Sequence, residues 1–273
     1  MSADSSQRRV QQRTEEAQAA FLVKVENRQA IPERNVLKVD VTVAPFDYIA
    51  EMNPWGYLYN CACTVYPRLV REFYRYLDVI QDKNHGIILQ TSAQGYMLQI
   101  DPHVISAIID FPVLPVSARS FTEDIEPPTL KQLKDYFHAH PQSHEQAHAF
   151  IKIGAFSPPH RLFAKIVLHN LWPTVRKSEL VLKRAQFLYA LCMRMPFCLC
   201  KHILNLLLDM RDKHSIGLPF ACLITKLIIQ SRIEVSAEPV MRIQDSLGIQ
   251  TLMKSNAQLR FEGQGEAHQP PLA

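Results

Sequence analysis

The chain contains 273 residues, of which 47% are hydrophobic and 21% are charged, and its formal net charge is +4. This composition is typical of a globular protein with one large core or two smaller ones, and it excludes disorder along the whole chain. The low glycine content, 8 residues against 18 prolines, argues against glycine-rich phosphate loops and many-turned β-sandwiches. Helices that end at prolines fit this composition better.

The first twenty residues predict an intracellular protein. They carry charges and no continuous apolar core, which excludes a secretory signal, and Glu15 and Glu16 argue against an organellar transit peptide. No apolar run reaches the roughly 18 to 20 residues that a membrane-spanning helix needs. Six cysteines in or beside apolar segments fit a reducing compartment, and the sequence does not distinguish nucleus from cytoplasm.

The N-terminal third predicts an arm, a strand and a helix. Residues 1–35 are polar with thinly spaced apolar side chains, which predicts a mobile arm. Over 36–43, apolar residues recur at every second position, which predicts a short half-buried strand. Over 64–81, apolar residues recur every three or four positions around Pro67, which predicts an amphipathic helix with Thr64 as its N-cap.

A β-hairpin and a short helix are expected next. Segments 87–91 and 96–100 flank the tetrapeptide SAQG, in which Gly95 can supply the positive φ of the turn. Asp101 then has the place of an N-cap, followed by a helix that stops before Pro112.

The rest of the chain is predicted to be mainly helical. A Pro-rich loop is expected over 116–128, and Thr129 is placed to cap the helix that follows it. A further helix is expected to open at Ser157, and residues 168–235 form the most apolar and most basic part of the chain. Short connections in this part predict three packed antiparallel helices. These helices are expected to begin at Ser178, at Pro196 and after Pro219, and one more broken helix is expected after Pro239.

The predicted fold class is therefore mainly α, with a small N-terminal α+β portion that contains a short β-hairpin and with a C-terminal helical bundle. The α+β part is assigned to residues 36–115 and the bundle to 129–260. Residues 261–273 are predicted to be a disordered tail.

One stretch matches a metalloprotease pattern. Residues 144–148 read HEQAH, which satisfies H-E-x-x-H; on a helix, His144 and His148 would bind zinc while Glu145 acts as general base. So short a pattern also arises by chance, and Ile151 and Gly154 stand where the extended form needs glycine and histidine. A zinc-dependent hydrolase is therefore kept only as an alternative. No P-loop, dinucleotide-binding or nucleophile-elbow motif is found, so no cofactor and no catalytic residue are predicted.

Basic charge is the other functional candidate. From residue 160 to 232, basic residues outnumber acidic ones by twelve to three. Such an excess attracts nucleic acid by neutralising phosphates. The alternative is that these side chains are the solvated edges of an apolar bundle, which leaves protein contacts or self-association as the function. The candidate nucleic-acid contacts are Arg176, Lys177, Lys183, Arg184, Lys201 and Arg211.

A family resemblance rests on three separated blocks: LVREFY at 69–74, KRAQFLYAL at 183–191 and GLPFACLIT at 217–225. With these blocks the chain resembles the putative plant transposon protein domain, a family found beside or within gypsy-type retroelement sequences. Pro173, Ser178 and Arg184 also fall where this family places its proline, serine and arginine. The resemblance covers roughly residues 36–260.

The resemblance implies a retroelement-derived domain and supplies no active site to carry over. We therefore favour a non-enzymatic domain that contacts nucleic acid or protein. The alternatives are a protein-interaction module without nucleic-acid binding and the zinc-dependent hydrolase. No membrane partner is expected.

Overall fold

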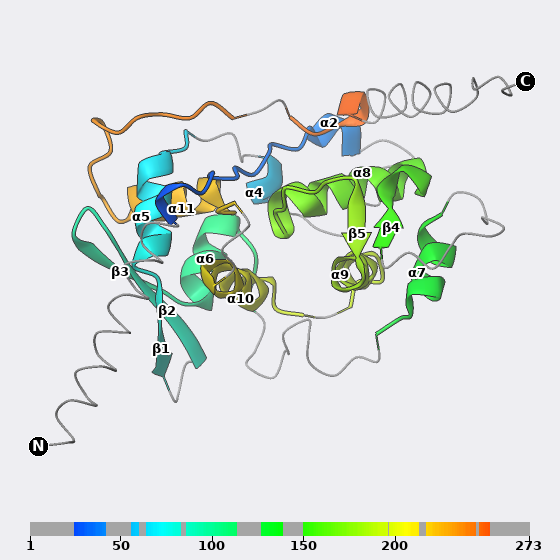
Figure 1. Ribbon diagram of the computed structural model, residues 1–273, viewed down its shortest axis with the longest axis horizontal. Helices are drawn as coiled ribbons and strands as arrows, with labels where there is room; N and C mark the ends of the chain where they lie inside the picture. Colours follow the sequence, from blue (N-terminus) through cyan, green and yellow to red (C-terminus); the bar gives the residue numbers. More distant parts are fainter. Residues whose placement is uncertain are drawn as a thin grey trace, which may run out of the picture.

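The computed structural model describes residues 25–41, 56–59, 64–82, 86–113, 127–138, 150–195, 197–212, 217–243 and 246–251. Within these ranges it contains a three-stranded and a two-stranded antiparallel sheet with helices around them (Figure 1). No helix in the described ranges is long and apolar enough to cross a membrane.

A small sheet with a helix on one face forms the N-terminal layer. The strands β1 (Asp78–Asp82), β2 (Gly86–Ala93) and β3 (Tyr96–Ile100) pair antiparallel in this order. The helix α5 (Pro67–Arg75) packs against β2 and buries Leu69, Val70, Phe73 and Tyr74. The Thr91 hydroxyl donates to the Phe73 carbonyl at 2.6 Å, which ties the strand to the helix. The described part of this half also contains the helices α2 (Lys38–Val41), α4 (Gly56–Tyr59) and α6 (Pro102–Ile109).

Two local predictions are confirmed in this layer. The hairpin turns at Gln94 and Gly95, whose φ values of 48° and 78° define the mirror-image turn that suits twisted strands. The Asp101 carboxylate accepts from the Val104 backbone N–H at 2.8 Å and caps α6.

Two boundaries differ from the prediction. The helix expected over 64–81 ends at Arg75, because residues 78–82 find a pairing partner in β2 and become β1. Its N-cap is Tyr66 and not Thr64. The strand expected over 36–43 is wrong from Lys38 to Val41, which form α2; in the described part of this stretch, residues 36–41, only Val36 makes a β-bridge, with Leu247. Alternation of apolar and polar residues over so short a stretch does not show whether a partner strand is present. Here the pairing is limited to the single bridge between Val36 and Leu247.

The C-terminal half begins with α7 (Leu130–Phe137), which Thr129 caps as predicted; the structure adds a capping box with Gln132. It continues with β4 (Phe150–Lys152), the 3-10 turn η1 (Ile153–Ala155), α8 (Pro158–Ile166) and the π-helical turn η2 (Val167–Leu171). After these come β5 (Glu179–Val181), α9 (Leu182–Cys192), α10 (Leu199–Asp212) and α11 (Ala221–Gln230). Ser178 does not cap a helix, because residues 179–181 pair with β4 before α9 starts. Of the broken helix expected after Pro239, the described residues 240–243 and 246–248 are not helical and residues 249–251 are; the rest of that stretch lies outside the described residues.

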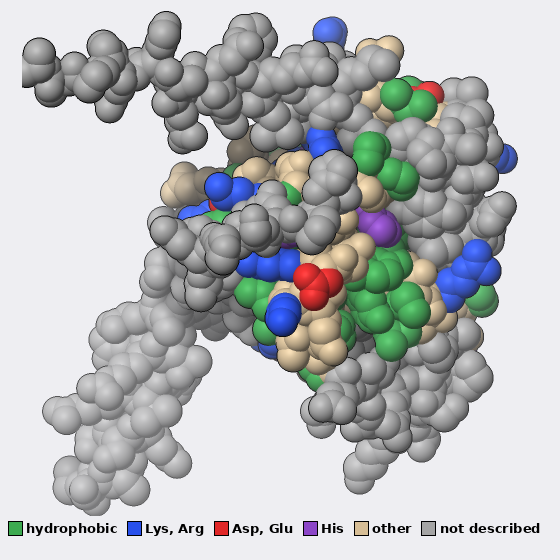
Figure 2. All heavy atoms as spheres, turned by 90° about the vertical axis from the view of Figure 1, so that its right-hand side faces the viewer, with side chains coloured by type: hydrophobic (Ala, Val, Ile, Leu, Met, Phe, Trp, Pro, Cys, Tyr) green, Lys and Arg blue, Asp and Glu red, His purple; other side chains and the backbone are tan. Residues whose placement is uncertain are grey.

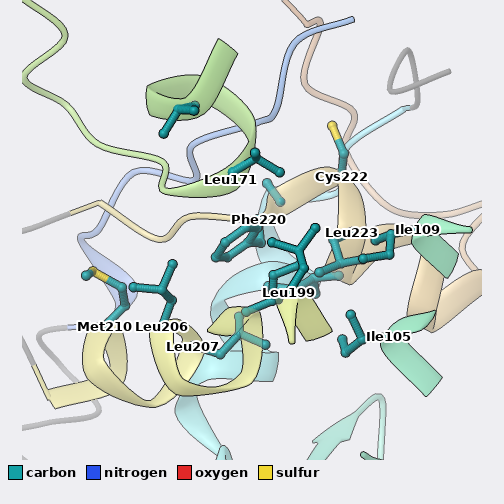
Figure 3. Packing of buried hydrophobic residues seen from close by; sticks show 14 of the residues in the cluster. Ile105, Ile109, Leu171, Leu199, Leu206, Leu207, Met210, Phe220, Cys222 and Leu223 are labelled. Carbon is teal, nitrogen blue, oxygen red and sulfur yellow. The ribbon is translucent and has the colours of Figure 1, made fainter. Parts of the chain in front are cut away.

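The predicted C-terminal helical bundle is wrong, and the fold is mixed α/β. The main packing partner of α10 is α6, and α11 packs on α5 and α6, so both helices complete the core of the N-terminal layer. The helix α9 packs instead on β4, β5 and α7. Figure 3 shows Leu199 and Leu207 of α10, Leu223 of α11 and Ile109 of α6 meeting around Phe220. The sequence shows that each helix has an apolar face, but it does not show which element covers that face.

An extended segment, residues 28–37, crosses the molecule from beside α11 to α2 (Figure 1) and is called the strap below. Its backbone hydrogen-bonds Leu218 near one end and Leu247 near the other, at N–O distances of 2.7 to 2.8 Å. Ala30, Ile31 and Val36 of the strap are buried. Residues that the sequence assigned to an N-terminal arm therefore contribute to the core.

Candidate nucleic-acid interface

Positive charge is concentrated in one part of the fold. Residues 150–195, which comprise β4, η1, α8, η2, β5 and α9, contain eight Lys or Arg and one acidic residue; we call this part the basic lobe. The remaining described residues contain thirteen basic and thirteen acidic ones. Figure 2 shows this end of the molecule, where Lys and Arg side chains lie on several parts of the coloured surface and carboxylates are sparse. The excess of charge therefore belongs to one contiguous structural unit.

The six sequence-predicted contact residues divide between two places. Arg176, Lys177, Lys183 and Arg184 belong to the basic lobe, whereas Lys201 and Arg211 lie on α10. Arg176 and Lys183 are exposed. Arg211 donates to the Leu77 carbonyl at 3.3 Å and to the Asp78 carboxylate at 3.4 Å, so it fastens α10 to the start of β1.

Arg184 has a structural role in the lobe. Its guanidinium lies over the Trp172 ring, 5.8 Å from the centroid, and burial lowers its pKa. Trp172 in turn meets the edge of Phe187, which stacks on His202 of α10 at 4.3 Å between ring centroids. Burial lowers the pKa of His202 to about 3, so this ring is neutral at pH 7. The aromatic contacts join α9 to α10.

Lys177 and His169 form a half-buried pair. The Lys177 ammonium donates to His169 Nδ1 at 2.9 Å, and the His169 side chain is only 5% exposed. Burial, followed by the charges of Lys177, Arg34 and Lys165, lowers the pKa of His169 to about 2. Burial and the charge of Arg34 lower the pKa of Lys177 to about 8. The histidine is therefore a neutral acceptor among cations.

Sequence reasoning missed three members of this group. Arg34 lies in the strap, which the sequence assigned to an N-terminal arm, and neither Lys165 nor His169 is among the predicted nucleic-acid contacts. A signal was present, because Lys165 and His169 stand four residues apart and share one helical face.

Another sequence candidate, the HEQAH segment with His144, Glu145 and His148, lies outside the described residues. Within the described ranges, no group of three or more His, Cys, Asp or Glu side chains is placed to hold a metal ion. The cysteines described there, 192, 198, 200 and 222, are free thiols.

The fold and the charge define a mixed α/β domain with one strongly basic lobe. A family model described as "Putative plant retrotransposon-related domain" matches residues 53–234, about two thirds of the chain, and the chain belongs to this family. The protein is thus retroelement-derived; the association with gypsy-type elements in particular stays a prediction. No curated protein and no solved structure matches the chain.

Proposed function

We propose that this retroelement-derived protein is a non-enzymatic domain that binds the phosphate backbone of nucleic acid with its basic lobe. The observation that carries the proposal is the segregation of charge: eight basic residues and one acidic residue in 150–195, against balanced charge in the remaining described chain. A patch of one sign raises the local concentration of an oppositely charged polymer and speeds its association.

The side chains at the lobe surface favour contacts to phosphates over contacts to bases. Lys152, Arg176, Lys183 and Arg194 are exposed. The strongly exposed large apolar side chains of the lobe are aliphatic: Val175, Val181, Leu182 and Met193. Binding without sequence preference needs cations along the backbone, and base stacking needs accessible aromatic rings. The proposed binding is therefore largely independent of sequence.

Neutralising single exposed cations tests the proposal. Arg176→Ala and Lys183→Ala are each expected to weaken binding of a mixed-sequence duplex at low salt several-fold, and equally for unrelated sequences, because each removes one phosphate contact. Fluorescence anisotropy of a labelled duplex measures the affinities. Arg242→Ala is the matched control, since Arg242 is also exposed but lies outside the lobe. Equal losses of affinity in all three variants would show that the basic lobe is not the binding interface.

Exposed aliphatic side chains support a second candidate, a protein-interaction module. Val175 is 67% exposed and Val181 48% exposed, and each lies within two residues of an exposed cation. Apolar side chains rimmed by charge are typical of protein contacts. Absence of nucleic-acid binding even at low salt would favour this second candidate.

A further inference from the structure

Aromatic side chains from three distant parts of the sequence meet where α7 lies against the basic lobe. Tyr136 belongs to α7, His160 to α8 and Tyr189 to α9. The Tyr136 ring lies 5.1 Å from the His160 ring and 4.9 Å from the Tyr189 ring, measured between centroids. Because these rings are far apart in the sequence, only the fold shows that they form one group.

The neighbouring contacts hold the Tyr136 ring in one orientation. Phe137 and Tyr189 meet it edge to face, at interplanar angles of 83° and 78°, which is a favoured arrangement of aromatic pairs. The His160 ring is tilted by 37° against it, and His160 Nδ1 is held by the Ser157 hydroxyl at 2.9 Å. The Tyr136 ring is therefore preorganised, and a ligand that binds it does not have to order it.

Part of this aromatic group faces solvent. Tyr136 is 36% exposed, while His160 and Tyr189 are half-buried. At the end of α9, Met193 is 49% exposed, and its backbone N–H donates to the Tyr189 carbonyl at 2.8 Å. In Figure 2, hydrophobic side chains gather on this end of the molecule next to Lys and Arg side chains. The aromatic group thus borders an accessible apolar surface.

Exposed cations lie close to these rings in the sequence. Lys131 is exposed and belongs to the same helix as Tyr136, and the exposed Arg194 directly follows Met193. Within α7, two lysines outnumber the one acidic residue, Asp135. The adjoining basic lobe adds its own excess of positive charge. The surroundings of the rings are therefore net positive, as the binding of a polyanion requires.

We propose that Tyr136 is a stacking platform for one base of a single-stranded nucleic acid whose phosphates contact the basic lobe. Proteins that bind single strands combine such rings with a cationic surface, and stacking tolerates every base because each has a flat π-face. In a duplex the bases are stacked inside the helix and do not reach a ring on a protein surface. The inference rests on the proposed function for the phosphate contacts and adds to them a contact that favours single strands.

Calorimetric titration of the full chain with two single-stranded oligonucleotides of equal length tests the site. One oligonucleotide carries bases and the other is abasic, so both present the same phosphates and only the first can stack. The wild type is expected to bind the oligonucleotide with bases about 10-fold more tightly. Tyr136→Leu should bind both with the affinity that the wild type has for the abasic one. Tyr136→Phe keeps the ring and should retain the preference.

Tyr96→Leu is the matched control, because Tyr96 is 63% exposed but lies on β3, outside α7 and the basic lobe; it should keep the full preference. Unchanged affinity of Tyr136→Leu for the abasic oligonucleotide shows that this variant is folded with its cationic surface intact. Equal affinities of the wild type for the two oligonucleotides, a full preference in Tyr136→Leu or a lost preference in Tyr136→Phe would overturn the stacking site and leave the proposed function in place. If neither oligonucleotide nor a duplex binds, both proposals fall.

Discussion

Replacing Glu33 by alanine is expected to lower the free energy of unfolding by about 3–5 kcal/mol, which is on the order of 10 °C in unfolding temperature. Glu33 lies in the strap and its side chain is 0% exposed. Its carboxylate accepts from the Tyr57 hydroxyl at 2.6 Å and from the backbone N–H groups of Cys222 and Leu223 at 2.7 and 2.9 Å. Alanine leaves three buried donors without an acceptor.

The size of the effect follows from the place of Glu33 at the start of α11. The N-cap residue of this helix, Phe220, has a positive φ of 57° and provides no side-chain cap. Glu33 takes over this role from a distant part of the sequence, because its carboxyl oxygens accept from the N–H groups of Cys222 and Leu223 in the first turn. Burial nevertheless raises the pKa of Glu33, which shows that desolvation outweighs these hydrogen bonds.

Urea unfolding of the variants Glu33→Ala, Glu33→Gln and Tyr57→Phe measures the decrease in the free energy of unfolding. Glutamine retains one acceptor oxygen, and Tyr57→Phe removes only one of the three donors, so both should cost clearly less than alanine. A Glu33→Ala variant within about 1 kcal/mol of the wild type would show that the strap does not hold α11.

Lowering the pH from 7 to 5 is expected to cost about 2 kcal/mol of stability for each of two histidines, His169 and His202. Their pKa values in the folded protein are about 2 and about 3, because both rings are buried and cations also surround His169. In the unfolded chain each titrates near 6.5, so below this pH the unfolded state binds more protons. Stability from these groups is present above pH 6.5 and is lost as the pH falls towards their folded pKa values.

Glu33 has the opposite effect on stability: because its pKa is raised, the folded state binds a proton more readily than the unfolded state as the pH falls. This contribution of Glu33 is the same in the wild type and in a histidine variant, so it cancels when their pH dependences are compared. His202→Phe keeps an aromatic ring stacked on Phe187 but does not titrate, so it should lose about 2 kcal/mol less than the wild type between pH 7 and 5. His103→Gln changes an exposed histidine and is the control. An unchanged pH dependence in His202→Phe would contradict the assignment.

Features governed by neighbouring residues could be predicted from the sequence. Gly95 in the hairpin turn, Asp101 as the cap before Pro102 and Thr129 as the cap of α7 each act within a few positions, and all three have the predicted roles. The family resemblance was likewise carried by contiguous blocks, and the family match confirms it as a retrotransposon-related domain.

Features that depend on distant partners could not be predicted. The apolar faces of α10 and α11 looked like those of a bundle, yet α6 and α5 cover them. Ser178 is of a residue type that often caps helices, but the residues after it form a strand because Leu180 pairs with Ile151. Glu33 and Arg34 gain their roles only because the strap crosses to α11 and η2, and no local pattern contains that information.

The salt dependence of binding to a mixed-sequence DNA duplex is the most direct test of the basic lobe as a nucleic-acid interface. Each phosphate that a cation neutralises contributes about −0.9 to the slope of log Kobs against log salt. With Lys152, Arg176, Lys183 and Arg194 exposed in the lobe, the wild-type protein should bind at about 50 mM salt with a slope of about −3 to −4. No binding at that salt concentration, or an affinity that does not change with salt, would contradict the proposed function.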